Sequence, residues 1–266
     1  MVIPFLHDCH RQPGRRATLQ EARRRLAGLP AAPRQSGMSL ADSLLRQLAD
    51  DNNPHSLAHK LRTRRFQRFE ALVSGLTSPV HILDLGGTSG FWERRGWAGR
   101  NDIQITTLNL VAEEPRHSNI KPLVGDATDL GQFADGGFDV AFSNSLIEHL
   151  RTFEKQRHMA GEIQRVGKAF WVQTPSFWFP VEPHFHVPGW QWMPVPLRVA
   201  MLRRWRCGWI GPCNDPLRAR DMVQEVRLMT KSELQSLFPG ATLVPEYFCG
   251  LVKSWIAIGG FSQRLQ

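Results

Sequence analysis

The sequence predicts an α/β fold with a doubly wound, mostly parallel sheet of seven strands, and three observations lead to this prediction. From about residue 79 onward, short apolar runs alternate with longer stretches of helical periodicity. The first of these runs breaks into a cluster of glycines and leads directly into a helix. Two further strand-like runs, 241–248 and 251–258, close the chain as a hairpin-like pair. A chain of 266 residues, 42% of them hydrophobic, is long enough for one such domain with additions.

The stretch 82–91, with the sequence ILDLGGTSGF, carries the most information about function. A buried strand is expected to end here, and Gly86, Gly87 and Gly90 follow it before the helix begins. A turn of this kind between strand and helix is typical of nucleotide-handling folds. Glycines permit positive φ and carry no Cβ, so a ligand can lie against bare backbone, and the helix start presents unpaired N–H groups.

The glycine spacing separates two classes of cofactor. A dinucleotide fingerprint requires G-x-G-x-x-G, but counting from Gly86 the later positions hold Thr88 and Phe91. The spacing that fits is Asp-x-Gly-x-x-x-Gly, formed by Asp84, Gly86 and Gly90. In this the chain resembles the class I S-adenosylmethionine-dependent methyltransferases. A glycine-rich turn with a purely structural role in a parallel sheet is the alternative for this segment alone.

The resemblance continues in the expected order over residues 54–262. Residues 103–110 predict a second strand, with Asn109 where the family carries an acid for the ribose hydroxyls. Asp126 stands where the family contacts the adenine amino group. The run FDVAFSNSLIEHL at 138–150 is typical of the methyltransferase type 11 group. A helix at 159–166, a fifth strand at 169–174 and a helix at 228–238 with a Thr230/Glu233 capping box complete the predicted Rossmann-like order.

The resemblance implies that S-adenosyl-L-methionine is the cofactor and S-adenosyl-L-homocysteine the product. In the family, the glycine loop wraps the methionine half, and the acid at the position of Asp84 interacts with its charged amino acid end. Asn109 can bond a hydroxyl but lacks the charge that strengthens such a bond. The cofactor-binding residues expected from the resemblance are Asp84, Gly86, Gly87, Thr88, Gly90, Phe91, Asn109, Leu110, Asp126, Ala127, Ser143 and Asn144.

Charge and composition divide the chain into three parts. Residues 1–37 hold five of the nine net positive charges and several prolines, which predicts a disordered basic leader. Residues 38–78 predict two helices, 39–50 and 53–76, which the family often places as a lid over the cofactor. Residues 79–266 predict the methyltransferase domain. Phe5 is the one Phe, Tyr or Trp of the leader that could stack on single-stranded nucleic acid, so an extension without function is favoured over a nucleic-acid or membrane arm.

An insertion at 175–220 is expected to build the acceptor site. Aromatic bulk beside arginines suits an amphipathic helix at a membrane surface, a lid over a ligand pocket, or an ordinary packed subdomain. The aromatic residues are Phe177, Trp178, Phe179, Phe185, Trp190, Trp192, Trp205 and Trp209, and the basic cluster is Arg198, Arg203, Arg204 and Arg206.

Four residues are candidates for catalysis: His184, His149, His186 and Glu182. If residues 182–186 are extended, their alternate side chains share one face and converge. A metal site there is not favoured, since three ligands on one strand seldom reach a suitable geometry, and no metal is expected. Histidine is the usual base near neutral pH. His149 and its neighbour Glu148 compete for the role, with packing under the cofactor as their alternative.

The sequence therefore predicts methyl transfer to a small-molecule or a lipid- or glycan-linked acceptor, at oxygen. An RNA methyltransferase would suit the charge, but the segment 143–146 lacks the [Asn/Asp]-Pro-Pro-aromatic pattern of amino-group methylation, so nucleic acid is not expected as a partner. A non-catalytic partner protein that keeps the fold is the third possibility. The N-terminus lacks a secretory pattern, no apolar run spans a membrane, and the four cysteines show no zinc spacing, which favours a cytoplasmic protein with peripheral contact to anionic membrane.

Overall fold

The computed structural model describes residues 56–261. These residues fall into two compact units, one that ends at Ser74 and one that continues from Gly75. The expected helix at 39–50 and the basic leader at 1–37 lie outside the described residues.

Helix α3 (Leu57–Val73) is the described part of the first unit. It begins at Ser56, whose hydroxyl oxygen accepts the N–H of His59 at 3.0 Å, a favoured way to satisfy a helix start. Phe66 and Phe69 are buried, with ring centroids 6.1 Å apart. The predicted helix at 53–76 is thus present with shorter ends, and its role as a lid stays a prediction.

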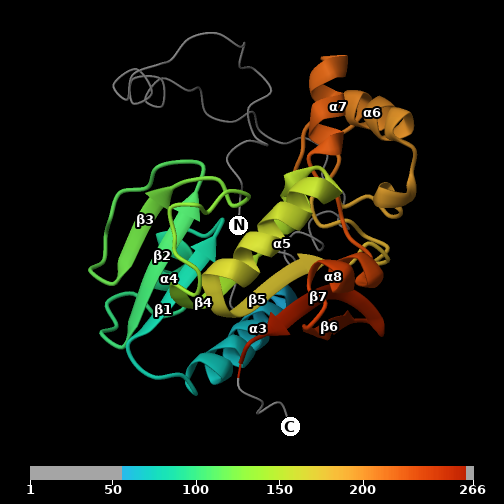
Figure 1. Ribbon diagram of the computed structural model, residues 1–266. Coiled ribbons are helices and arrows are strands. Elements are labelled where there is room, and N and C mark those ends of the chain that lie inside the picture. Colours follow the sequence, from blue (N-terminus) through green and yellow to red (C-terminus); the bar gives the residue numbers. More distant parts are fainter. Residues whose placement is uncertain (1–55, 262–266) are drawn as a thin grey trace. The chain divides into compact units, whose positions relative to one another are not determined.

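The second unit is built on one seven-stranded sheet with the order β3-β2-β1-β4-β5-β7-β6 (Figure 1). The first five strands run parallel, whereas β7 is antiparallel to β5 and β6 is antiparallel to β7. This confirms the predicted fold class, an α/β Rossmann-like sheet with an antiparallel C-terminal edge. The strands are β1 (Val80–Leu85), β2 (Ile103–Asn109), β3 (Ile120–Val124), β4 (Phe138–Asn144), β5 (Gly167–Pro175), β6 (Thr242–Phe248) and β7 (Leu251–Gly259).

The helices of this unit fall into two groups. In Figure 1, α5 and α8 lie together against the sheet, while α6 and α7 pack on each other in the insertion. The insertion at 175–220 therefore contains α6 and the start of α7. The helical elements are α4 (Ser89–Arg94), η2 (Ile147–Leu150), α5 (Phe153–Val166), η3 (Trp190–Trp192), α6 (Val195–Arg204), α7 (Pro216–Gln224) and α8 (Lys231–Leu237).

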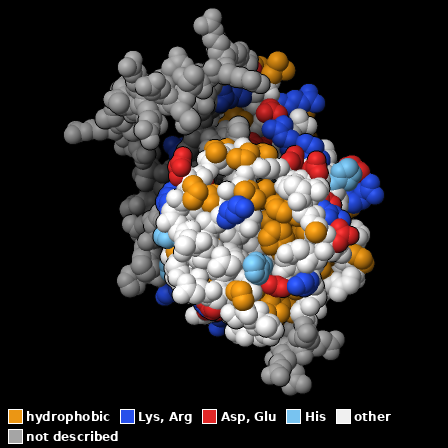
Figure 2. Space-filling model, turned by 60° about the vertical axis from the view of Figure 1, so that its left-hand side comes forward, with side chains coloured by type: hydrophobic (Ala, Val, Ile, Leu, Met, Phe, Trp, Pro, Cys, Tyr) orange, Lys and Arg blue, Asp and Glu red, His pale blue; other side chains and the backbone are white. Residues whose placement is uncertain are grey.

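The core lies between the central strands and α5. Because β1 is covered on both faces, its adjacent residues Ile82 and Leu83, which point to opposite faces of the sheet, are both buried, and the strand reads as a continuous apolar run rather than an alternating one. Helix α5 presents Met159, Ile163 and Val166 to this core at spacings of three and four residues. On the face drawn in Figure 2, hydrophobic side chains are scattered, and acidic and basic ones lie side by side at the upper right.

Two local predictions at the C-terminus are confirmed. Cys249 and Gly250 form the two-residue turn between β6 and β7, with φ of 49° and 76°, as a right-twisted hairpin requires. Thr230 and Glu233 form the capping box of α8: the Thr230 N–H donates to Glu233 Oε2 at 2.8 Å, and the Glu233 N–H donates to Thr230 Oγ1 at 3.2 Å.

The packing of α5 on the sheet predicts a large effect of Ile163→Ala. Ile163 is fully buried, so truncation should lower the free energy of unfolding by about 2–5 kcal/mol through lost burial and a cavity. Urea denaturation measures it, with the exposed Arg157→Ala on the same helix as a control that should stay near wild type. An Ile163→Ala variant as stable as the control would contradict this packing.

Candidate functional site

A cavity of about 540 Å³ lies where the first three parallel strands end. Its walls come from segments that directly follow β1, β2 and β3, and from η2 and the start of α5. Because β1 is flanked by β2 on one side and β4 on the other, the strand order reverses here, and open α/β sheets bind ligands at such a switch point.

The wall after β1 is bare backbone. Gly86 has a φ of 79°, and its N–H donates to the carbonyl of Leu108 at 2.8 Å. A Cβ on Gly87 would lie 1.7 Å from the Asp84 carboxylate oxygen Oδ2, so no larger residue fits unless the turn or the Asp84 side chain shifts. Both glycines line the cavity.

Asp84 supports this turn from behind and is not among the residues that line the cavity. Trp92 Nε1 donates to its Oδ2 at 2.8 Å. Burial raises the pKa of the Asp84 carboxyl to about 7, and the bond from Trp92 opposes part of that rise. The contact of Asp84 with the cofactor's amino acid end therefore stays a prediction, while its contacts with Trp92 and the turn are shown.

Asn109 ends β2 and ties this strand to the glycine turn. Its Nδ2 lies 3.4 Å from the carbonyl oxygens of both Gly86 and Gly87. The amide nitrogen thus faces the turn, which leaves Oδ1 as the atom suited to accept a hydroxyl. An aspartate in this place would set a second oxygen against two carbonyls, which gives a physical reason for the amide.

Two carboxylates complete the walls after β2 and β3. Asp126 lines the cavity, and its Oδ1 accepts the N–H and the hydroxyl of Thr128, both at 2.8 Å. Glu113, which the sequence analysis missed, also lines the cavity and accepts the N–H of Ser89 at 2.9 Å. No motif marks Glu113, since its role depends on the fold of the loop that carries it.

Seven of the twelve predicted cofactor residues line the cavity and five do not. Phe91 packs its ring against Phe142 with centroids 5.8 Å apart, and the buried Ser143 hydroxyl lies 3.5 Å from the carbonyl of Leu85. Lining the cavity are Gly86, Gly87, Thr88, Asn109, Leu110, Asp126 and Ala127; the others are Asp84, Gly90, Phe91, Ser143 and Asn144, whose cofactor role stays a prediction.

His149 brings an ionisable side chain to the same cavity. Its Nδ1 is buried, and no hydrogen-bond partner for it exists in the described part of the chain. Burial, aided by the nearby charge of His184, lowers the pKa of His149 to about 3, so its imidazole is neutral at physiological pH. The two rings meet edge to face with centroids 4.8 Å apart.

His184 is held in turn by Glu182. Its Nδ1 lies 2.5 Å from Glu182 Oε1, and Glu182 Oε2 accepts the N–H groups of His184 and Phe185 at 2.8 and 2.7 Å. Burial works to lower the pKa of His184, but the bond to Glu182 and nearby carboxylates outweigh it, and the net shift is upward.

The expectation that three side chains converge on one extended face was wrong. Residues 182–186 form a turn, in which the His186 N–H donates to the Glu182 carbonyl at 2.9 Å and His186 has a φ of 51°. His186 instead packs its ring against Trp209, with centroids 5.2 Å apart. The turn brings Glu182 and His184 together and directs His186 elsewhere.

Glu148 is buried and does not line the cavity. Its Oε2 accepts the Thr174 hydroxyl at 3.0 Å, and burial raises the pKa of its carboxyl to about 7. These contacts support the alternative in which Glu148 is packed under the cofactor site and does not act in catalysis.

Glu225 is a cavity residue that the sequence analysis missed. It follows α7 and lines the cavity together with Arg151, whose guanidinium forms an ion pair with Asp221 on the same helix. Burial raises the pKa of the Glu225 carboxyl, and the charge of Arg151 opposes the rise. An acid at a helix end carries no sequence signal of such a role, since only the folded insertion brings it to the strand ends.

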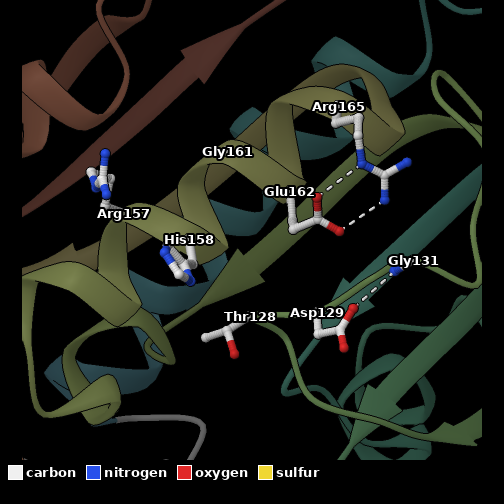
Figure 3. A pocket seen from close by; sticks show the side chains of 8 residues that line it. All are labelled: Thr128, Asp129, Gly131, Arg157, His158, Gly161, Glu162 and Arg165. Carbon is white, nitrogen blue, oxygen red and sulfur yellow. Dashed lines mark hydrogen bonds and ion pairs between the residues drawn. The ribbon is translucent and has the colours of Figure 1, made fainter.

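A second hollow of about 630 Å³ lies on the outer side of α5 and is shown in Figure 3. Its charged side chains are paired within the protein: Arg165 bonds Glu162 and Asp135, and Glu162 also accepts the N–H of Leu130 at 2.8 Å. Such a network satisfies its own charges, so this groove is not the candidate site.

Metal centres and membrane-spanning helices are not found within residues 56–261. No cluster of three or more His, Cys, Asp or Glu side chains there is arranged to hold a metal ion. No helix of this part of the chain has the length and apolar character needed to cross a membrane.

Residues 83–169 match the family model described as a methyltransferase domain. This match agrees with the predicted resemblance to the class I S-adenosylmethionine-dependent methyltransferases. The match supports an enzyme that uses S-adenosylmethionine as its cofactor. No curated protein matches the chain.

The similarity of the chain to solved structures is weaker than its match to the family model. A candidate sarcosine dimethylglycine methyltransferase from Galdieria sulphuraria is 21% identical, with a TM-score of 0.34, 43% of this chain covered and 46% of that one, so the match spans less than half of that protein. A methyltransferase from Methanosarcina mazei is 14% identical, with a TM-score of 0.44 and coverages of 69% and 92%. The N-methyltransferase NodS from Bradyrhizobium japonicum is 13% identical, with a TM-score of 0.43 and coverages of 79% and 97%. None of these identifies the acceptor of the methyltransferase.

The residues present fit this cofactor. The bare backbone of Gly86 and Gly87 leaves room against the turn, Asn109 offers a hydroxyl acceptor, and the Asp126 carboxylate is fixed by Thr128. Bound S-adenosylmethionine would supply an activated methyl group on sulfur.

The close approach of Gly87 to Asp84 predicts that Gly87→Ala weakens cofactor binding at least about tenfold, because the turn or the Asp84 carboxylate behind it must shift. Calorimetric titration with S-adenosylmethionine measures it. Gly161→Ala on α5, where a Cβ meets nothing within 4 Å, is the matched control. Wild-type affinity in the Gly87→Ala variant would contradict the geometry.

The raised pKa of Asp84 predicts a pH dependence of stability. Between its ordinary value of 3.8 and about 7, the folded state holds a proton that the unfolded state has lost, so stability from this group falls as pH rises. Asp84→Asn keeps an acceptor for Trp92 and should flatten the decline in unfolding free energy from pH 5 to 8. The unfolding free energy is measured by urea denaturation at each pH. An equal decline with pH in the variant and in wild type would contradict the prediction.

Proposed function

We propose that the methyltransferase transfers its methyl group to a hydroxyl oxygen of a small-molecule or lipid-linked acceptor. The observation that carries this proposal is that His149 and Glu225, two side chains able to accept a proton, line the same cavity as the glycine turn. An acceptor that arrives protonated at oxygen must lose that proton, whereas a neutral amine can attack without a base. Positioning supplies most of the remaining rate enhancement.

The pKa directions divide the work between the two groups. The neutral His149 imidazole can accept a hydrogen bond from the hydroxyl, but its pKa of about 3 makes it a weak holder of the proton. Burial moves the pKa of Glu225 upward, toward the working range of a base. Glu225 is therefore assigned as the base and His149 as the group that orients the hydroxyl, with its ring backed by His184 and Glu182.

Matched acceptors test this assignment. A panel of alcohols, phenols and the corresponding amines is incubated with the enzyme and S-adenosylmethionine, and formation of S-adenosylhomocysteine is measured. Turnover of hydroxyl compounds alone supports the proposal, and turnover of amines alone contradicts it.

With an accepted hydroxyl compound, Glu225→Gln should lower kcat by about 10²–10⁴-fold, because the base is lost while the shape stays. Its cofactor affinity in calorimetry should match wild type. Glu154→Gln, an exposed carboxylate on α5, is the control. An unchanged kcat in Glu225→Gln would remove Glu225 from the role.

The exposed part of the insertion supports a lipid-linked acceptor. Trp178 and Trp205 are 65% and 58% exposed, and the basic residues that end and follow α6 are exposed beside Trp205. Aromatic rings next to arginines suit the interface of an anionic membrane. Arg198, expected in this basic cluster, is instead half-buried and lines an internal cavity, so the exposed cluster is Arg203, Arg204 and Arg206.

Reversal of two charges tests the membrane contact. Arg203→Glu with Arg204→Glu should reduce cosedimentation with phosphatidylserine-containing vesicles, most strongly at low salt, because screening weakens the wild-type attraction. Lys121→Glu with Arg157→Glu reverses two exposed charges elsewhere and is the control. Equal sedimentation of both double variants, or none by wild type, would contradict the contact.

A further inference from the structure

A smaller cavity of about 160 Å³, separate from the cofactor cavity and from the groove beside α5, lies within the insertion and the segment that follows α7. Its size is close to that of an engineered protein cavity of ~150 Å³ that accommodates benzene, so it has room for one six-membered ring. Aromatic side chains form one part of its wall and polar side chains another. The residues used below are Glu182, Phe185, Trp190, Gln191 and Arg198.

Three polar atoms of this wall are buried and have no hydrogen-bond partner among the described residues: Trp190 Nε1, Gln191 Oε1 and Arg198 Nε. Trp190 is only 1% exposed. Buried polar atoms in native proteins are nearly always paired with protein, water or a ligand. Three such atoms around one cavity therefore indicate that it receives a polar occupant.

The donors and acceptors of this wall are fixed. Gln191 Nε2 donates to the carbonyls of Phe177 and Phe179 at 3.1 and 2.5 Å, so the amide cannot turn over and Oε1 remains the acceptor. Trp190 Nε1 and Arg198 Nε can only donate. The occupant must accept two hydrogen bonds and donate one.

The charges of the wall disfavour an ionic occupant of either sign. An anion would meet the Glu182 carboxylate and the Gln191 carbonyl oxygen, whereas a cation would meet the guanidinium groups of Arg198 and Arg227, the second of which is already paired with Glu233. Burial lowers the pKa of Arg198, and the charge of Glu182 opposes this shift, so the two groups interact electrostatically. Uncharged hydroxyl groups both donate and accept, so they satisfy all three atoms.

The aromatic wall suits a ring. Phe185 and Trp190 are stacked, with centroids 4.2 Å apart and planes 20° from parallel, and both are buried. Ligand sites are commonly apolar walls with a few placed polar groups. We propose that this cavity binds an uncharged, polyhydroxylated six-membered ring, such as a sugar unit of the methyl acceptor. The assignment to the acceptor rests on the proposed function, because Glu182 lines this cavity and also holds His184 beside His149.

Binding of three ring compounds tests the cavity in the full chain without cofactor. The probes are methyl β-D-glucopyranoside, cyclohexanecarboxylate and cyclohexylamine, followed by ligand-observed saturation-transfer NMR titrations. The glucoside is expected to bind and the two ions to bind more weakly. No glucoside binding, or tighter binding of either ion, would overturn the proposal.

Trp190→Phe keeps an aromatic ring and removes only the N–H donor, so it should weaken glucoside binding roughly two- to tenfold. Trp209→Phe, on an exposed tryptophan of the same insertion, is the matched control and should bind like wild type. Equal affinity of wild type and a folded Trp190→Phe would overturn the proposal. So would a crystal soaked with the glucoside in which only ordered water fills the cavity.

Separate measurements distinguish a failure of the proposed sugar site from a failure of the proposed methylation at a hydroxyl. Calorimetry with S-adenosylmethionine reports on the other cavity, and Trp190→Phe should leave that affinity unchanged. Methylation of hydroxyl compounds without glucoside binding overturns the sugar site alone. Glucoside binding that depends on Trp190, in an enzyme that methylates only amines, supports the site and overturns the hydroxyl chemistry.

Discussion

The contact between a buried carboxylate and a bare glycine turn is the constraint on which the rest of the site depends. Asp84 occupies the space in which a Cβ of Gly87 would lie, and Trp92 holds it there with a bond of 2.8 Å. Position 87 must therefore be a glycine, so the turn between β1 and α4 presents bare backbone at this position. Asn109 then approaches the carbonyls of the turn from β2, so the neighbouring strand end is held by the same feature.

Strand order gathers the remaining walls around that turn. Parallel strands end at one edge of the sheet, and the reversal at β1 opens a crevice there. Side chains that are far apart in the sequence, from Asn109 to Asp126, His149 and Glu225, thus line one cavity. The same burial that forms the cavity favours the neutral forms of His149 and Glu225, so the shape and the proton chemistry of the site have a common cause.

Local signals made much of this fold and part of its site predictable from the sequence. The glycine spacing at 86–90 and the Thr230/Glu233 capping box depend on residues a few positions apart, and both were recognised. His186 was misplaced because a turn at 182–186 looks the same in sequence as an extended segment. The place of Glu225 in the cavity and the burial of Arg198 could not be predicted, because the surroundings of both residues are created by contacts between the insertion and distant elements.

The central claim is that the cavity at the ends of β1, β2 and β3 holds the cofactor. A crystal structure of the enzyme grown with S-adenosylhomocysteine tests it most directly. We expect ligand density in this cavity, with the homocysteine end against the backbone of Gly86 and Gly87 and the adenine near Asp126. Ligand density at any other place, or a saturated crystal with this cavity filled only by water, would contradict it.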